Sequence, residues 1–261
     1  MIFMIPKYVQ AYTIAVVSLC SLTSCNKEIP VPMAVSVSFH GYNLSEDQLV
    51  ATFDTVVYDK DLIQPNSQYN FSKVYPYPPG KTELNIQVKN KKSGKELLKK
   101  TLSLSSGTLE FFFPLVYFDN KVLEVTPPVA DPETNKLGFY IRYKESNEPI
   151  DIILYKPQTG ERVYLAESVV PGTWVYTNYV PTAGFLSKND IQQCVLYFMK
   201  SGTTDQWAFN GDEYASKASA GSLYIPHMAY NFNKVQPYFI TPSPQGYQTD
   251  VSNMFPNPKE Y

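Results

Sequence analysis

The sequence predicts an all-β protein made of two tandem antiparallel immunoglobulin-like β-sandwich domains. Three observations lead to this class. The chain has 21 Tyr and 15 Phe, and aromatic side chains favour strands. It also has 21 prolines, which argue against long helices. Short stretches that alternate apolar and polar residues recur along the chain between turn residues, a spacing that is typical of β-sandwiches.

The chain begins with a segment that predicts export. Lys7 precedes the apolar run 11–22, which is too short to span a bilayer, so the pattern is that of a secretory signal. The following Leu22-Thr23-Ser24-Cys25 resembles a bacterial lipobox, whose cysteine takes a diacylglyceryl group and becomes the first residue after cleavage. We therefore expect residues 1–24 to be a lipoprotein signal peptide and residues 25–32 to be a lipidated tether. The alternative is an ordinary signal peptide in which Cys25 is incidental.

Residues 33–120 are expected to form the first sandwich. Val35–Phe39 alternates strictly, and Gly41 with Asn43 is expected to turn the chain. Gln48–Tyr58 alternates again and would place Val57 on the inward face. The clearest hairpin turns at Asn90–Lys95. Its inward residues are expected to be Leu84, Ile86, Val88, Leu98, Leu102 and Leu104. Two further strands are expected at Tyr69–Tyr75 and Leu109–Phe118.

Residues 121–240 are expected to form the second sandwich, with the proline-rich stretch Thr126–Lys136 as the candidate boundary. A single helical turn is expected at Ser187–Gln193, capped by Ser187 or Asn189. The expected strands are Leu137–Tyr143, Ile150–Tyr155, Arg162–Ala166, Thr173–Val180, Ile191–Lys200, Thr203–Phe209 and Gly221–Ile225. The sequence shows no fixed-period repeat, and it leaves open that the two halves are distant copies of one architecture.

The last segment, residues 241–261, contains four prolines and has no periodicity. It is expected to be either a mobile tail or a strap along the second domain. Its aromatic residues, Tyr247 and Phe255, favour the strap.

The sequence offers few groups for catalysis. After residue 24 the cysteines are Cys25 and Cys194, and the apolar neighbours of Cys194 predict a free, buried thiol. The chain has only two histidines, which limits triads and zinc sites, and the nucleophile-elbow and phosphate-loop motifs are absent. We interpret two close carboxylate pairs as solvated turn residues: Asp59 with Asp61, and Asp212 with Glu213. We expect no enzymatic activity, cofactor or metal.

Aromatic side chains are the better candidates for a ligand site, because flat rings can stack on sugar faces. Trp174 and Tyr176 share one face of an expected strand by its period of two. Trp207 follows a turn, and Asp205 and Gln206 lie beside it to meet hydroxyl groups. The alternative is that these rings are core residues. The sequence favours the core for Trp174 and does not decide between the two for Trp207.

Cys25, Glu28 and the tandem β-rich halves give the chain a resemblance to surface lipoproteins of Bacteroidota, many of which resemble accessories of Sus-type glycan-uptake systems. The resemblance implies an outer-membrane protein attached through lipid on Cys25. The acidic Glu28 favours the outer surface, and the periplasmic face is the alternative. Within Gln48–Tyr58, Asp54-Thr55-Val56 also resembles a Bacteroidota O-glycosylation signal, but the inward position expected for Thr55 argues against modification.

The function that the resemblance implies is non-enzymatic binding of an extracellular glycan at the cell envelope. The alternative is a structural subunit or adhesin that binds another envelope or host protein. The net charge is −2 and charged residues make up 18% of the chain. Because there is no basic surplus, we expect no nucleic-acid partner.

Overall fold

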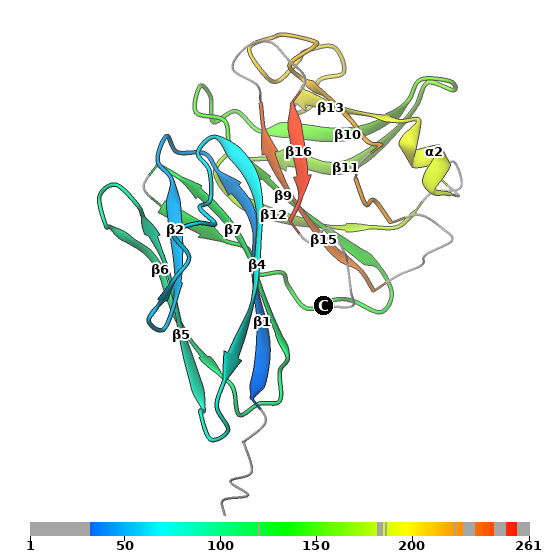
Figure 1. Ribbon diagram of the computed structural model, residues 1–261. Coiled ribbons are helices and arrows are strands. Elements are labelled where there is room, and N and C mark those ends of the chain that lie inside the picture. The colour runs from blue at the N-terminus through cyan, green and yellow to red at the C-terminus, as the bar shows by residue number, and fades with distance from the viewer. Residues whose placement is uncertain are drawn as a thin grey trace, which may run out of the picture.

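The fold is that of a computed structural model, which describes residues 32–119, 121–181, 185, 187–221, 223–226, 233–242 and 249–254 (Figure 1). Almost all of its regular structure is β, and its four sheets confirm the predicted class of tandem β-sandwiches. The signal peptide, Cys25 and the tether up to residue 31 lie outside the described residues. Among the residues that are described, no helix is long and apolar enough to cross a membrane.

The first domain packs two four-stranded sheets, ordered β4-β1-β7-β8 and β3-β2-β5-β6. Buried alternate residues of β1 and β5, such as Phe39 and Ile86, form one core between the sheets. The predicted hairpin is confirmed as β5 and β6, with its inward leucines buried. The strands are β1 (Met33–Asn43), β2 (Leu49–Phe53), β3 (Val56–Val57), β4 (Ser67–Tyr77), β5 (Glu83–Asn90), β6 (Glu96–Ser103), β7 (Glu110–Phe118) and β8 (Lys121–Glu124).

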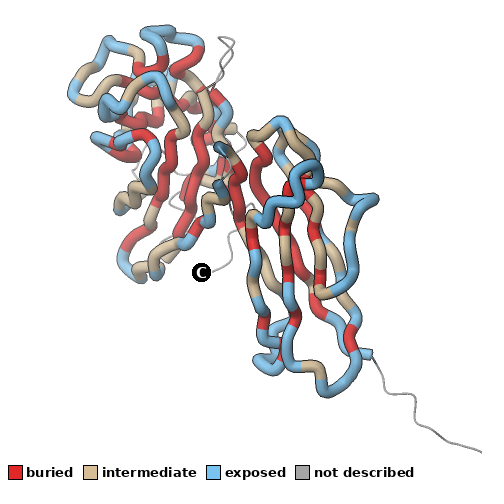
Figure 2. The backbone as a smooth tube through the Cα atoms, turned by 90° about the vertical axis from the view of Figure 1, so that its left-hand side faces the viewer, coloured by how far each residue is buried: buried red, intermediate tan, exposed pale blue. Residues whose placement is uncertain are grey.

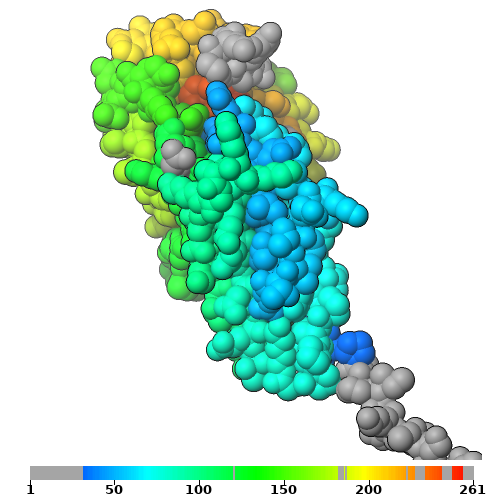
Figure 3. Space-filling view, turned by 60° about the vertical axis from the view of Figure 1, so that its left-hand side comes forward, coloured from blue at the N-terminus to red at the C-terminus, as the bar shows by residue number. Residues whose placement is uncertain are grey.

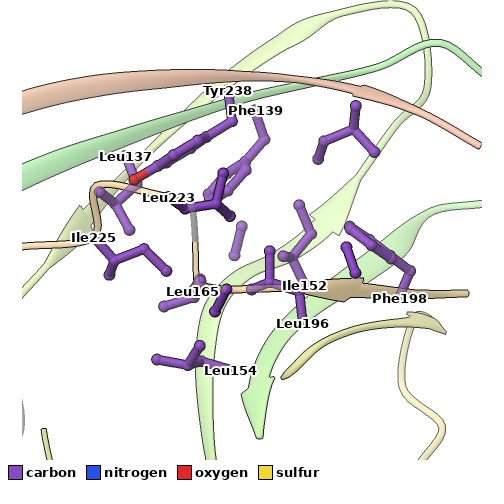
Figure 4. Packing of buried hydrophobic residues seen from close by; sticks show 14 of the residues in the cluster. Leu137, Phe139, Ile152, Leu154, Leu165, Leu196, Phe198, Leu223, Ile225 and Tyr238 are labelled. Atoms are coloured by element: carbon purple, nitrogen blue, oxygen red, sulfur yellow. The ribbon is translucent and has the colours of Figure 1, made fainter. Parts of the chain in front are cut away.

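The second domain also has two four-stranded sheets, ordered β12-β9-β15-β16 and β11-β10-β13-β14. Figure 4 shows its core, where Phe139 and Tyr238 of one sheet face Ile152 and Phe198 of the other. The elements are β9 (Asn135–Ile141), β10 (Ile150–Lys156), β11 (Glu161–Val169), β12 (Trp174–Tyr179), α2 (Lys188–Gln192), β13 (Val195–Lys200), β14 (Lys217–Ser219), β15 (Val235–Thr241) and β16 (Asp250–Asn253).

The two domains share one topology. Adding eight to each strand number of the first domain gives the strand order of the second. Each pair of neighbouring strands also keeps its parallel or antiparallel orientation between the domains. The halves are therefore two copies of one architecture, which the sequence had left open.

Each domain contains one parallel strand pair, β1 with β7 and β9 with β15, which the expectation of antiparallel sheets did not include.

The prediction of a turn at Gly41 was wrong, because β1 continues through Gly41 to Asn43. Gly41 has a φ of 147°, and a Cβ at this position would lie 1.9 Å from the Leu115 carbonyl oxygen of β7. Glycine is needed there because β7 passes too close for any side chain.

The expected strand Gln48–Tyr58 is broken by a tight turn. Asp54 has a φ of 49°, and the chain reverses there from β2 into the short strand β3. The prediction that Val57 points inward was wrong, since its side chain is 55% exposed. Thr55 is exposed in the same turn, so the argument against its modification does not hold.

The domain limits differ from those expected. β8 pairs with β7, so a boundary after residue 120 divides a hairpin of the first domain.

The last strands of the second domain are β15 and β16 rather than 203–209 and 221–225. β16 pairs with β15 and so forms part of the expected strap. The sequence did not predict β15, because the strand contains Pro237 and its apolar residues do not alternate regularly with polar ones. The predicted helical turn is confirmed as α2, with Ser187 as its N-cap.

The domains meet through the outer faces of their equivalent sheets, β4-β1-β7-β8 and β12-β9-β15-β16. Tyr42 and Val116 of the first domain form one buried cluster with Tyr140, Phe239 and Met254 of the second. Figure 2 shows buried segments of both domains meeting there, and Figure 3 shows the first domain (blue to green) extending away from the second.

Polar contacts border this junction. Tyr42 Oη donates to Asp250 Oδ2 at 2.7 Å, and Gln68 Nε2 donates to Ser252 Oγ at 3.3 Å. His40 Nε2 lies 3.3 Å from the carbonyl oxygen of Asn253. The cluster and its border join the two domains into one packed unit.

Candidate ligand-binding site

The outer face of the sheet β11-β10-β13-β14 carries a group of aromatic side chains. Leu154 and Leu196 point into the core, so the strand alternation turns Tyr155 of β10 and Tyr197 of β13 outward. Trp207 joins them through a β-bridge to Met199 of β13. We use the name "aromatic face" for this surface. It consists of Tyr155, Tyr164, Tyr197 and Trp207 with the cations Arg162 and Lys217.

Three rings of the aromatic face form a continuous row. The ring centroids of Tyr155 and Tyr197 lie 4.6 Å apart with an interplanar angle of 25°, so these two rings are stacked. Trp207 lies 5.2 Å from Tyr197 at 77°, which is an edge-to-face contact. All three side chains are half-buried. The stacked and edge-to-face contacts therefore cover part of each ring, and only the remaining part of each ring is open to solvent.

A hydrogen-bonded turn positions Trp207. The backbone N–H of Lys200 donates to the Gln206 carbonyl at 2.9 Å, and that of Ala208 donates to the Phe198 carbonyl at 3.0 Å. Beneath the turn, the buried carboxylate of Asp151 accepts the Gly202 N–H at 2.9 Å. The same carboxylate accepts the Ser168 N–H at 2.8 Å. Asp151 thus ties the turn to the sheet, which fixes the position of the indole.

The two cations cover parts of the row. Lys217 Nζ lies 5.0 Å from the Tyr197 centroid and 5.1 Å from the Trp207 centroid, and it forms an ion pair with Glu213. The Arg162 guanidinium lies 5.7 Å from the Tyr155 centroid. Cation–π contacts of this kind contribute about 0.5–1 kcal/mol at exposed sites. Burial raises the pKa of Tyr197, so its hydroxyl remains protonated at neutral pH.

The predicted site residues divide between two places. Asp205 and Gln206 are exposed beside Trp207. Trp174 and Tyr176 lie on β12, in the opposite sheet, and do not join the aromatic face.

Trp174 instead packs against the domain junction, with its ring centroid 5.4 Å from that of Tyr140. Tyr176 covers Gly138, where an added Cβ would lie 2.4 Å from the tyrosine ring. Burial raises the pKa of Tyr176 to about 12, and its hydroxyl group is buried. The pair therefore supports the structure beside the junction.

Sequence reasoning missed Tyr155, Tyr197, Arg162 and Lys217. Apart from Asp151, residues 150–155 and 195–199 are all apolar, so no regular alternation marks either tyrosine as outward-facing. The runs 150–155 and 195–199 give no sign that one face is left uncovered. A count of aromatic residues on neighbouring strands was the only available signal.

The close carboxylates have structural partners. Asp61 pairs with Lys73 at 2.8 Å, Asp212 Oδ1 accepts the Ala215 N–H at 2.8 Å, and Glu213 pairs with Lys217. The thiol of Cys194 is free and 3% exposed, which confirms that prediction. Burial raises the pKa of this thiol to about 11. Within the described parts of the chain, no group of three or more His, Cys, Asp or Glu could hold a metal ion.

No protein-family model matches the sequence, and no curated protein matches it. Among solved structures, it is similar to a proposed cell adhesion protein from Bacteroides uniformis ATCC 8492, with 9% identity over 89% of this chain and 98% of that chain and a TM-score of 0.24. It is also similar to the family CBM26 domain CBMbc of Amy13K from Eubacterium rectale, solved with maltoheptaose. That match has 13% identity over 85% of this chain and 96% of that chain, with a TM-score of 0.21. At these TM-scores neither similarity assigns a function to this chain.

Proposed function

We propose that this chain is a non-enzymatic, lipid-anchored protein of the cell envelope whose second domain binds extracellular glycan. The observation that carries the proposal is the row of Tyr155, Tyr197 and Trp207 on the outside of a sheet. Sugars offer CH groups that pack on aromatic carbon and hydroxyl groups that hydrogen-bond to polar tips. An indole N–H and two phenol hydroxyls on one rigid surface suit such a ligand.

The equivalent face of the first domain supports the proposal. There Gln87 of β5 lies between Thr52 of β2 and Lys99 of β6, and these three side chains are polar. The shared fold therefore does not require aromatic residues on this face. Clustered aromatic surface exposes apolar area to water and commonly marks an interaction site. If only the second domain binds a ligand, we expect aromatic residues on its outer face and polar residues on the equivalent face of the first domain, as the two domains have.

The position of the aromatic face also fits an anchored protein. The first described strand, β1, begins at the bottom of Figure 1, and the sheet with β10, β11 and β13 lies at the opposite end. With lipid on Cys25, the second domain would lie away from the membrane. We propose the outer membrane as its location and the cell surface as the side on which the aromatic face is displayed.

The two tryptophans provide a matched test. Trp207→Ala should abolish retention on a polysaccharide column to which the wild type binds. Trp174→Ala should keep that retention and lower the thermal midpoint through the domain junction. Trp207 is half-buried, so Trp207→Ala removes part of its buried ring area as well as one ring contact and one cation–π contact, and its midpoint should also fall. Retention is therefore compared at a temperature well below the midpoint of each variant. Loss of binding in Trp174→Ala alone would place the ligand elsewhere.

A protein ligand is the second candidate, and one observation favours it. Tyr155 and Tyr197 cover each other's faces, and Arg162 and Lys217 lie over the rings, so few flat ring faces are free. Trp, Tyr and Arg are also the residues enriched at hot spots of protein interfaces. In that case the chain is a structural subunit or adhesin. Cross-linking on intact cells should then give one defined adduct that Trp207→Ala removes, while a broad screen detects no glycan.

A further inference from the structure

Arg162 is held in a fixed place at one end of the aromatic row. It lies opposite Tyr155 in the β10–β11 ladder, and its guanidinium lies over the Tyr155 ring. Its Nη1 donates to the carbonyl oxygen of Thr204 at 3.3 Å, in the turn that leads to Trp207. Three elements thus hold one guanidinium: its own strand, the neighbouring ring and the Trp207 turn.

The charge of Arg162 is not matched by a carboxylate among the described residues. Seven lysines in the described chain form ion pairs, and the other cation of the aromatic face, Lys217, is paired with Glu213. Arg162 is exposed and has no such pair. A guanidinium carries five N–H donors in a rigid planar arrangement, and the Thr204 carbonyl takes one of them.

We infer that the glycan bound by the aromatic face is acidic, and that Arg162 binds its anionic group. This inference rests on the proposed glycan binding. The planar donors of arginine match the two oxygens of a carboxylate or sulfate, whereas a neutral hydroxyl group uses only one donor. The rings would contact the sugar next to the acid group. Arg162 is thus the residue that selects uronate-containing or sulfated chains over neutral ones.

The test compares matched ligands on the purified chain. Polygalacturonate and its methyl ester differ only in the carboxylate, and dextran sulfate and dextran differ only in the sulfate, so the two pairs separate the two acid groups. We expect at least one acidic polymer to bind more tightly than its neutral form. Arg162→Gln should weaken that binding by about 10- to 100-fold and change binding of the neutral form by less than about threefold. Arg162→Lys should fall between Arg162→Gln and the wild type.

Lys99→Gln is the matched control, because it removes one exposed positive charge from the equivalent face of the first domain. It should leave binding unchanged. Since Arg162 is exposed, Arg162→Gln should keep the thermal midpoint within a few degrees of the wild type. An equal loss in Lys99→Gln would mean nonspecific attraction of polyanions and would overturn the inference.

Two other results separate the inference from the proposed function. Tight binding of a neutral glycan that depends on Trp207 but not on Arg162 would refute the acidic ligand and leave glycan binding in place. If the wild type binds no glycan, neutral or acidic, both the inference and the proposed function fail.

Discussion

Phe239→Ala should separate the unfolding of the two domains. Phe239 of β15 is 1% exposed, and its ring stacks on Tyr140 at a centroid distance of 5.5 Å. From the first domain, the rings of Tyr42 and Phe118 approach it to 5.9 and 6.4 Å. The side chain lies at the centre of the junction cluster. Its removal takes away contacts with both domains at once.

The expected magnitude follows from the burial of this ring. A buried Phe→Ala change costs about 3–5 kcal/mol. For a chain of this size, each kcal/mol shifts the thermal midpoint by about 2–4 °C, so the midpoint should fall by roughly 6–20 °C. Part of the lost free energy is coupling between the domains. The first domain should therefore unfold at a temperature different from that of the second.

Two optical probes can follow this separation. Both tryptophans of the chain lie in the second domain, Trp207 on its aromatic face and Trp174 beside the junction, so tryptophan fluorescence reports the second domain and the junction but not the core of the first domain. Far-UV circular dichroism reports both domains. The two midpoints should coincide in the wild type and separate in Phe239→Ala.

Phe198→Ala is the control, because Phe198 is fully buried in the core of the second domain and lies outside the junction cluster. It should lower the fluorescence midpoint without weakening the junction. Coincident midpoints in Phe239→Ala, together with a fall of less than about 2 °C, would refute the view that this cluster couples the domains.

Four further outcomes are expected. Cys25→Ala should abolish lipid labelling and lipoprotein-type cleavage, and labelled lipid on the variant would disprove the lipobox assignment. Thiol counting on denatured, unreduced protein should find Cys194 free, and the folded protein should react slowly because burial raises the pKa of this thiol to about 11. Burial lowers the pKa of His40, so the folded protein favours the neutral imidazole. The resulting contribution to the free energy of unfolding is complete above about pH 6.5 and is lost as the pH falls through the folded pKa. His40→Gln should reduce this loss of stability at acid pH, as measured by denaturant titrations. Limited proteolysis should cut first before residue 32 and then within 126–134, and a first cut inside the β5–β6 hairpin would contradict the domain map.

Local signals in the sequence were enough for the elements with a clear period or cap. The β5–β6 hairpin has apolar residues at every second position and a turn with Gly94, so one face had to be buried. Ser187 could satisfy free N–H groups at a helix start, and its side chain accepts the N–H of Asp190. The buried state of Cys194 followed from its apolar neighbours in the same way.

The parallel strand pairs and the domain junction depended on contacts between residues far apart in the sequence. His40 and Tyr42 of β1 point away from the core of their own domain and are buried where the second domain packs, Tyr42 in the junction cluster and His40 beside Asn253. No local pattern shows which outer face another domain will cover. Strand alternation alone would have left both side chains in solvent.

The sequence by itself determined that this is a β-rich chain with two sandwich-sized halves, because the period of the apolar residues and the turn chemistry are local properties. The tertiary structure decided where the candidate site lies. Trp174 and Trp207 were both candidate ligand residues, yet one packs at the domain junction and the other joins Tyr155 and Tyr197 on an open face. The physical reason is that exposure depends on which strands and domains cover a side chain, and chain segments distant in the sequence supply that cover.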